Sequence, residues 1–441
     1  MKERHAANAV TIGAVFASIL VLYGLTFSFR AITDTNMNSL QTRALVLHGD
    51  VDLSRYGELP AIPGQFAKRG GQILSVYGVG ISIVAAPIYF VLVHLGASEH
   101  LLQGAVGALY AAAAAVVFHT VVRRIAPPAL AAAATIVFAF GTTMWTVASM
   151  GLFLQGPVVF FECLALAGLF SRKPSGVTLA GFAMGMATFI RPTAVIPLAI
   201  IGIFYLTQGR RSVTSYALAA LVPVLAVVAQ NQLLWGSWLT GGYSYQPYGF
   251  HASMPHALWG LTFGLWRGLF VYSPILLLAL IGVMLAWRDR RGTFESRLIF
   301  LAVSSAATIL FYSKWTIWWG GLNQFGYRLL LETMPFLMIL VVYAVVRVDR
   351  LRPLALLLGS LSVLTMTWGA ASSRGGWDGE LFATKFRDTS LGQSWIVFFD
   401  KPLQGIARLA GVAIVGVVIA FARPRFRPRK DLPPSTAEAA T

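Results

Sequence analysis

The sequence predicts an all-α membrane protein that crosses the bilayer about twelve times. Hydrophobic residues make up 57% of the 441 residues and charged residues only 12%, about half the charged fraction of a soluble domain. Long apolar runs recur along the chain, and a run of about 18 residues or more can cross a hydrocarbon core. The basic residues lie in short clusters between these runs, as they do in the loops of polytopic membrane proteins.

Twelve apolar runs are expected to be transmembrane helices. The first of them lacks a small-residue cleavage site, so we interpret it as a retained helix and not as a signal peptide. The expected spans are residues 7–28, 101–122, 128–148, 152–170, 176–190, 193–208, 213–234, 268–287, 297–313, 330–346, 353–370 and 405–422.

A further apolar run, about 73–95, is assigned from charge. If it crosses the membrane, the basic doublets at 123–124, 172–173 and 210–211 alternate between the two sides. If it lies on or dips into the outer face, every doublet falls on one side, in agreement with the positive-inside rule. We therefore expect a multi-pass protein of the bacterial cytoplasmic (inner) membrane with both termini in the cytoplasm.

This topology predicts one transmembrane domain with its chemistry on the extracytoplasmic face, because the inner loops are only a few residues long. The domain is expected to cover residues 1–422, followed by a disordered cytoplasmic tail at 423–441. Its sizeable outer loops are expected at 29–100, 235–267, 314–329 and 371–404, the first of them with juxtamembrane helices.

Several functional classes are disfavoured by the composition. The net charge of +17 is explained by membrane topology, and no basic face with interleaved aromatic residues indicates nucleic-acid binding. The absence of a P-loop motif argues against an ATP-driven pump. His251 and His256 lie close together on an outer loop, but no acid or cysteine accompanies them. We expect no cofactor, and nothing in the sequence supports a divalent cation.

The outer loops contain an aspartate and several basic residues at the ends of expected spans. Asp34 follows the first span and is a candidate general base, although a carboxylate there is also a common way to end a helix. Cations at the headgroup level suit a lipid phosphate, while structural ion pairs or lipid contacts are the alternatives for each arginine. The candidate phosphate-binding residues are Arg267, Arg328, Arg191, Lys68 and Arg69.

The same loops are rich in aromatic and amide side chains. Interfacial aromatic belts account for part of this pattern. The stretch at 318–324 is expected to form a flat aromatic platform beside amide hydrogen-bonding groups, which is a surface that suits a sugar. The candidate sugar- or acceptor-binding residues are Gln155, Tyr77, Trp318, Trp319, Asn323, Tyr243 and Tyr245.

These groups together suggest the transfer of a sugar from a polyprenyl phosphate. An aspartate base would deprotonate an acceptor hydroxyl, which attacks the anomeric carbon and expels the lipid phosphate. The phosphate leaves without a general acid if cations stabilise its charge, whereas a glycosidase usually needs a second carboxyl group.

The order of these segments resembles that of the GT-C membrane glycosyltransferases, especially relatives of protein O-mannosyltransferases and of the lipid A aminoarabinose transferase. The resemblance covers most of the chain. The segments that carry it are TDTNMNSLQTRALVLHGDVDLSRY (33–56), SVYGVGISIVAAPIYF (75–90), LFLQGPVVFF (152–161), GFAMGMATFIRPTAVI (181–196), RGLFVYSPILLLALIG (267–282) and WWGGLNQFGYRLLLETMPF (318–336).

The resemblance implies a GT-C-like fold, juxtamembrane helices in the first outer loop, and an inverting transfer with Asp34 as the single base. It also implies that Arg267 and Arg328 contact the donor phosphate. Two features depart from the pattern. Gln155 stands where many relatives have a second acid or a histidine, and Tyr77-Gly78-Val79-Gly80 replaces a proline-rich turn. The acceptor is a glycan, a lipid or a protein hydroxyl in the cell envelope.

Two other classes of function stay open at this point. A transporter or flippase of lipid-linked sugars would also need arginines and aromatic residues around a phosphate, but it should carry polar residues near mid-membrane in several spans. A catalytically silent scaffold in envelope assembly is the third possibility, and the glutamine at position 155 leaves it open.

Overall fold

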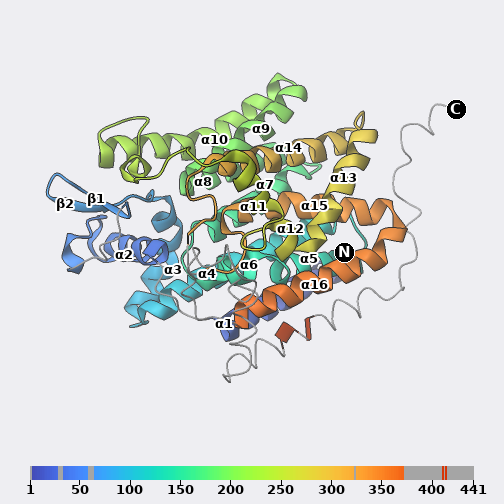
Figure 1. Ribbon diagram of the computed structural model, residues 1–441, viewed down its shortest axis with the longest axis horizontal. Coiled ribbons are helices and arrows are strands. Elements are labelled where there is room, and N and C mark those ends of the chain that lie inside the picture. Colours follow the sequence, from blue (N-terminus) through green and yellow to red (C-terminus); the bar gives the residue numbers. More distant parts are fainter. Residues whose placement is uncertain are drawn as a thin grey trace.

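The computed structural model describes residues 2–27, 33–57, 64–321 and 324–371, together with 410, 411, 413 and 414. Figure 1 shows a body of long helices that run roughly parallel, with α2, α3 and a small hairpin gathered at one end. Within the described residues the only strands are β1 (Phe66–Arg69) and β2 (Gln72–Ser75), which pair antiparallel. The predicted all-α architecture is confirmed.

The remaining elements follow in a nearly unbroken series. They are α1 (Lys2–Thr26), α2 (Thr33–His48), α3 (Gly80–His94), α4 (Glu99–Val122), α5 (Pro128–Phe140), α6 (Thr143–Thr146), α7 (Gln155–Leu169), α8 (Ser175–Ile190), α9 (Val195–Thr207), α10 (Arg210–Gln230) with a π-helical extension (Asn231–Trp235), α11 (Met254–Thr262), α12 (Leu269–Tyr272), α13 (Leu277–Arg288), α14 (Thr293–Lys314), the 3₁₀ segment η7 (Arg328–Thr333), α15 (Met334–Arg347) and α16 (Arg352–Ala371). Further single 3₁₀ turns include Pro192–Ala194 and Gly242–Tyr245.

The helices are long and apolar enough for a multi-pass membrane protein. Six of the described helical stretches reach the length and hydropathy of a membrane span, and they involve α4, α5 with α6, α10, α14, η7 with α15, and α16. Six others are apolar but shorter, so the number of twelve spans stays a prediction. The expected span at 405–422 lies almost wholly outside the described residues, as does the tail at 423–441.

The span expected at 268–287 is interrupted. Residues 268–287 were predicted as one helix, but α12 ends at Tyr272 and a 3₁₀ turn at Pro274–Leu276 precedes α13. Pro274 explains the break, because a proline lacks the N–H for an intrahelical bond and restricts the residue before it. The interruption places the start of α13 beside α16, where Ile275 N–H donates to Ser362 Oγ (3.2 Å).

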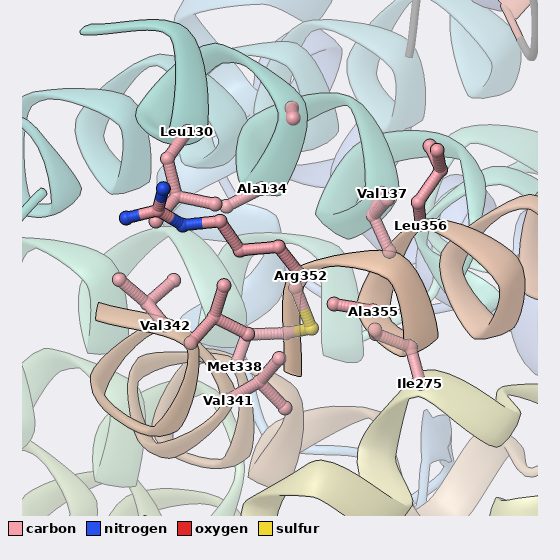
Figure 2. A pocket seen from close by; sticks show the side chains of 12 residues that line it. Leu130, Ala134, Val137, Ile275, Met338, Val341, Val342, Arg352, Ala355 and Leu356 are labelled. Atoms are coloured by element: carbon pink, nitrogen blue, oxygen red, sulfur yellow. The ribbon is translucent and has the colours of Figure 1, made fainter. Parts of the chain in front are cut away.

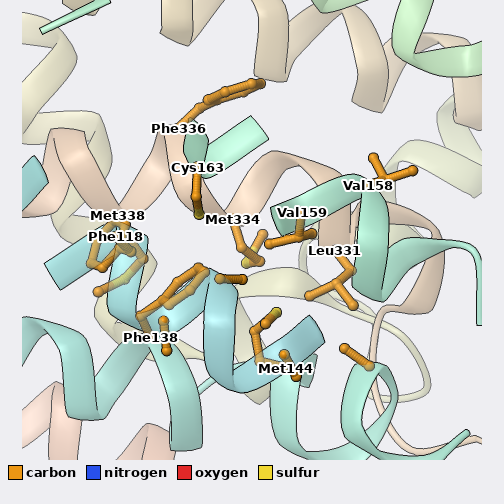
Figure 3. Packing of buried hydrophobic residues seen from close by; sticks show 14 of the residues in the cluster. Phe118, Phe138, Met144, Val158, Val159, Cys163, Leu331, Met334, Phe336 and Met338 are labelled. Atoms are coloured by element: carbon orange, nitrogen blue, oxygen red, sulfur yellow. The ribbon is translucent and has the colours of Figure 1, made fainter. Parts of the chain in front are cut away.

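Close helix packing depends on small residues, as is common in membranes. A Cβ on Gly181 would lie 2.1 Å from the Tyr216 carbonyl oxygen, so glycine lets α8 approach the backbone of α10. The centre of the body is a continuous apolar core, part of which is shown in Figure 3. There Phe118 of α4 stacks on Phe138 of α5 with ring centroids 4.4 Å apart, and Cys163 of α7 is fully buried nearby.

Buried hydrogen bonds fix the end of α1. The Tyr23 hydroxyl donates to the Ala139 carbonyl (2.8 Å), and Trp145 Nε1 donates to Thr26 Oγ1 (2.8 Å). All four residues are buried. The end of α1 is therefore held in place by buried contacts.

The polar sequence of α2 is explained by its burial. Asn38 Nδ2 donates to the Leu152 carbonyl (2.9 Å), Gln41 Nε2 donates to Ser82 Oγ (3.1 Å), and Gln103 Nε2 donates to Asn36 Oδ1 (3.0 Å). These partners come from α3, α4 and the segment before α7. Buried polar side chains that are hydrogen-bonded fix the orientation of an element more specifically than apolar contacts do, so α2 presents its first turn at one place.

The hairpin and Asp52 close the first loop. Gly70 and Gly71 form the two-residue turn with φ of 56° and 81°, values that glycine adopts without strain. Asp52 Oδ1 accepts hydrogen bonds from the amides of Ser54 and Ile73, both at 3.0 Å. Burial by itself would raise the pKa of Asp52, but these two hydrogen bonds, a third from the Ser54 hydroxyl and the charge of Arg55 together lower the pKa below its usual value. Asp52 is thus a turn-forming residue.

Candidate active site

An ion pair joins the start of α2 to the start of η7. Asp34, in the first turn of α2, contacts Arg328 Nη2 through its Oδ2 atom. The side chain of Asp34 is 18% exposed and that of Arg328 is 9% exposed. The guanidinium of Arg328 also lies over the ring of Phe153, 4.6 Å from its centroid. The pair therefore lies at the edge of the helical body and is open to solvent mainly on the Asp34 side.

The loop before η7 positions Arg328. Gln324 Oε1 accepts from Arg328 Nη1 (3.1 Å), and the Gly320 carbonyl accepts from the same nitrogen (3.3 Å). Gln324 Nε2 in turn donates to the Gly321 carbonyl (2.9 Å). Gly320 and Gly321 have φ of 80° and 92°, so the loop uses a backbone conformation that favours glycine.

Arg267 lies at the centre of this loop. Its side chain is fully buried, and its guanidinium donates to the carbonyls of Gln324 (2.5 Å), Gly326 (3.2 Å) and Gly321 (2.9 Å). This differs from the direct phosphate contact that the sequence predicts for Arg267, since both terminal nitrogens bind carbonyl oxygens of the loop. In the structure Arg267 therefore holds this loop, and its contact with a phosphate stays a prediction.

Two tyrosines border the Asp34–Arg328 pair. The rings of Tyr77 and Tyr243 meet edge to face with centroids 5.8 Å apart. The Tyr77 hydroxyl donates to Gln65 Oε1 (2.8 Å) and lies beside the Asp34 carboxylate. Burial, and then the charge of Asp34, hold the pKa of Tyr77 well above its usual value. Burial raises the pKa of Tyr243 to about 12, with Arg191 and Asp34 acting in opposite directions. Both hydroxyls are therefore neutral near pH 7.

A second ion pair lies deeper, between Arg191 at the end of α8 and Glu332 of η7. Their side chains are 8% and 2% exposed. Tyr312 donates to Glu332 Oε1 (3.0 Å) and Thr193 donates to Oε2 (3.2 Å), so both carboxylate oxygens have partners. Sequence reasoning missed Glu332, although an acid four residues after Arg328 at the start of an apolar run is the kind of residue that needs a buried partner.

Glu162 of α7 lies near this second pair. It is fully buried, and neither of its carboxyl oxygens has a hydrogen-bond partner among the described residues. Arg191 and Glu332 are the charged groups that act on it. Gln155, at the start of the same helix, is also buried, and its Oε1 has no partner within the described part of the chain.

Three predicted residues lie apart from the Asp34–Arg328 pair. Lys68 is exposed on β1, and Arg69 donates to the Leu234 carbonyl (2.9 Å), which ties the hairpin to the end of α10. Tyr245 is 48% exposed and packs on Trp235 with ring centroids 4.9 Å apart.

The predicted flat aromatic platform does not form. The rings of Trp318 and Trp319 are perpendicular, with an interplanar angle of 90°. Trp318 is buried against Gly260 of α11, whose Cβ would meet the indole at 2.2 Å, and Trp319 stacks on Trp266 with centroids 5.6 Å apart. The tryptophans pack this loop against the helical body. Asn323 lies outside the described residues.

A separate apolar groove with a cavity volume of about 70 Å³ lies between α5, α15 and α16. Figure 2 shows its walls, which include Leu130, Val137, Met338 and Val342, with the long side chain of Arg352 along it. The groove contacts α15 beyond its first turn, and neither the Asp34–Arg328 pair nor the two tyrosines line it. No three His, Cys, Asp or Glu side chains gather as a metal site within the described ranges.

No family model matches the chain, and no curated protein sequence does. Solved structures with the same fold include ArnT from Cupriavidus metallidurans bound to undecaprenyl phosphate, with 12% sequence identity and a TM-score of 0.54. The same enzyme in the apo state aligns with 13% identity and a TM-score of 0.51. Both alignments cover 94% of this chain and 77% of the ArnT chain. The chain therefore has an ArnT-like fold, which confirms the GT-C-like architecture that the segment order predicts.

Proposed function

We propose that this protein is an inverting glycosyltransferase that moves a sugar from a polyprenyl-phosphate donor to an acceptor hydroxyl. The reaction would take place on the extracytoplasmic face of the bacterial cytoplasmic membrane, with both termini in the cytoplasm. The acceptor would be a glycan, a lipid or a protein of the cell envelope. The ArnT-like fold supports the donor class, because one of the ArnT structures contains undecaprenyl phosphate.

The observation that carries the proposal is the Asp34–Arg328 pair with the hydroxyls of Tyr77 and Tyr243 beside it. A carboxylate can accept the proton of an acceptor hydroxyl, and a guanidinium is suited to a phosphate by its planar set of donors. Neutral phenols can donate hydrogen bonds to sugar or phosphate oxygens. The site thus combines the base, the anion-binding group and the polar contacts that the reaction needs.

In the proposed step, the Asp34 carboxylate removes the proton from the acceptor hydroxyl as its oxygen attacks the anomeric carbon. The bond between that carbon and the phosphate oxygen breaks, and the electron pair leaves with the polyprenyl phosphate. Arg328 stabilises the charge that grows on the phosphate. The proton on Asp34 then passes to water or to the departing phosphate, which restores the carboxylate.

The other predicted residues have proposed roles that follow from their places. Arg191 lies close enough to act electrostatically on Asp34, and Gln155 offers an unpaired amide oxygen to a sugar hydroxyl. Lys68 and Arg69 lie on the hairpin, where they would attract the anionic headgroup during entry. Arg267 would hold the loop that carries Arg328.

The test is sugar transfer from a panel of radiolabelled polyprenyl-phosphate sugars into membrane extracts. Native protein is compared with Asp34→Asn, which removes the base but keeps the shape. Asp50→Asn is the matched control, because Asp50 lies beyond the other end of α2 and is likewise paired with an arginine, Arg55, in a partly exposed ion pair. We expect transfer by the native protein and the control, and a loss of about 10²–10⁴-fold in Asp34→Asn.

Equal transfer by Asp34→Asn would show that Asp34 is not the base. No transfer by the native protein from any donor, with extracts that supply glycan, lipid and protein acceptors, would argue against the enzyme. In that case a flippase or a scaffold would be the better interpretation of the ArnT-like fold.

A further inference from the structure

We propose that Arg328 is a switch that binds either the Asp34 carboxylate or the donor phosphate, so that the base is released only when the donor is bound. This inference rests on the proposed function for the class of ligand. It adds a coupling between donor binding and the base that neither the fold nor the presence of these residues implies.

The first argument is the unpaired donor on Arg328. Its Nη1 atom binds Gly320 and Gln324, and its Nη2 atom binds Asp34. Its Nε atom is buried and has no partner among the described residues. Nε and Nη2 share one edge of the guanidinium, and the contact of Asp34 with Nη2 leaves the Nε of that edge without a partner. A buried N–H without a partner is costly.

A phosphate suits the same edge better than Asp34 does in this arrangement. Two phosphate oxygens can accept from Nε and Nη2 together, in the bidentate geometry that arginine favours. This would pair the nitrogen that is now unsatisfied. It would also displace Asp34, because two anions cannot occupy one edge.

The second argument is the charge balance around the loop. Arg328 and Arg267 act on each other electrostatically, and Arg267 binds only neutral carbonyl oxygens. Arg191 is already compensated by Glu332. Asp34 is therefore the one carboxylate for two guanidiniums, and the described loop carries a surplus positive charge. A phosphodiester monoanion would neutralise that surplus, since it brings one negative charge.

The consequence for the reaction follows directly. In the resting arrangement Oδ2 of Asp34 is engaged by the guanidinium of Arg328 and not by an acceptor hydroxyl. When the donor phosphate takes Arg328, the carboxylate is released next to the anomeric carbon, where the acceptor hydroxyl must arrive. Donor binding would then precede activation of the acceptor.

The experiment measures binding, independently of turnover. The dissociation constant of undecaprenyl phosphate is determined for the purified native protein, Asp34→Asn, Arg328→Gln and the double variant. Removing the competing carboxylate should tighten binding about tenfold, equivalent to about 1.4 kcal/mol. In the Arg328→Gln background the same Asp34→Asn change should have little effect, because the contested group is absent. Arg328→Lys is a second variant that keeps the charge but not the two-nitrogen edge, and it should shrink the effect of Asp34→Asn.

Asp50→Asn controls for a general loss of negative charge and should leave the dissociation constant unchanged. The switch is wrong if Asp34→Asn fails to tighten binding, or tightens it equally with arginine, lysine or glutamine at position 328. Either result would leave the proposed transferase intact as long as the lipid binds and Asp34→Asn abolishes transfer. If none of the variants binds the lipid, both the switch and the proposed donor class are wrong.

Discussion

Replacing Arg267 by methionine should destabilise the protein and deform the loop that carries Arg328. Methionine fills a similar apolar volume but donates no hydrogen bond. The carbonyls of Gln324, Gly326 and Gly321 would then lose the guanidinium that binds them now. The Gly321 carbonyl keeps its hydrogen bond from Gln324 Nε2 (2.9 Å), whereas the other two carbonyls lose the guanidinium. A buried polar group without a partner costs about 1–3 kcal/mol and a lost hydrogen bond about 1 kcal/mol. A total of about 3–6 kcal/mol is therefore expected once partial relaxation is allowed for.

The matched control is Arg69→Met. Arg69 also donates to a carbonyl, that of Leu234, but it does so once and from a half-buried position. Its removal should cost about 1 kcal/mol or less. The two variants therefore compare the loss of stability at a buried arginine with three acceptors and at an arginine of the hairpin.

Cys163 provides the assay. It is the sole cysteine of the chain and is fully buried, so a thiol-reactive dye becomes fluorescent when the core opens. An unfolding entropy of about 2 cal/mol/K per residue over 441 residues gives a shift of about 1 °C per kcal/mol. Arg267→Met should lower Tm by about 3–6 °C and Arg69→Met by about 1 °C or less. An unchanged Tm in Arg267→Met, with weaker binding of undecaprenyl phosphate, would refute the positioning role and restore the direct phosphate contact.

Three further outcomes are expected. Glu332→Gln leaves Arg191 buried without its counter-charge and should cost about 3–5 kcal/mol, whereas Asp289→Asn, in an ion pair whose side chains are 42% and 36% exposed, should cost about 1 kcal/mol or less in the same thermal assay. The pKa of Tyr243 is about 12 in the folded protein and about 10 in an unfolded chain. The neutral phenol therefore stabilises the fold fully below pH 10, and this contribution is lost as the pH rises from 10 to 12. Over this range the Tm of Tyr243→Phe should fall less steeply with pH than that of the native protein. Gly181→Ala places a methyl group against the α10 backbone and should lower Tm by a few degrees. An unchanged Tm, measured at equal detergent concentration, would contradict this expectation.

The helical architecture was predictable because long apolar runs and basic clusters are strong signals in a membrane chain. The hairpin was also within reach, since Gly70-Gly71 between two short runs that begin at Phe66 and end at Ser75 is a recognised hairpin pattern. The hairpin was not predicted because its second strand overlaps the apolar run at about 73–95, which is interpreted from the sequence as a helix on the outer face. The broken helix before α13 carried a signal too, in Pro274.

The site was only partly predictable. Asp34 and Arg328 are 294 residues apart, and no local spacing shows that they touch. Their placement at the ends of expected spans and the resemblance to GT-C glycosyltransferases were the indications that they share a site. Arg267 was assigned to a phosphate from its place near a span end and from the family resemblance, and Trp318 to a sugar from the aromatic and amide pattern at 318–324. In the structure both side chains are buried. Arg267 donates to carbonyl oxygens of the loop before η7, and Trp318 packs on Gly260 of α11.

The segment η7 contains both Arg328 and Glu332, and their partners come from opposite regions of the sequence, α2 and the end of α8. A shift of this short segment must therefore strain both ion pairs at once. Substitutions at Asp34 and Arg191, although they lie on different helices, should have non-additive effects. A mutational screen that scores these two positions one at a time would misjudge both, and pairwise libraries are the appropriate design for this protein.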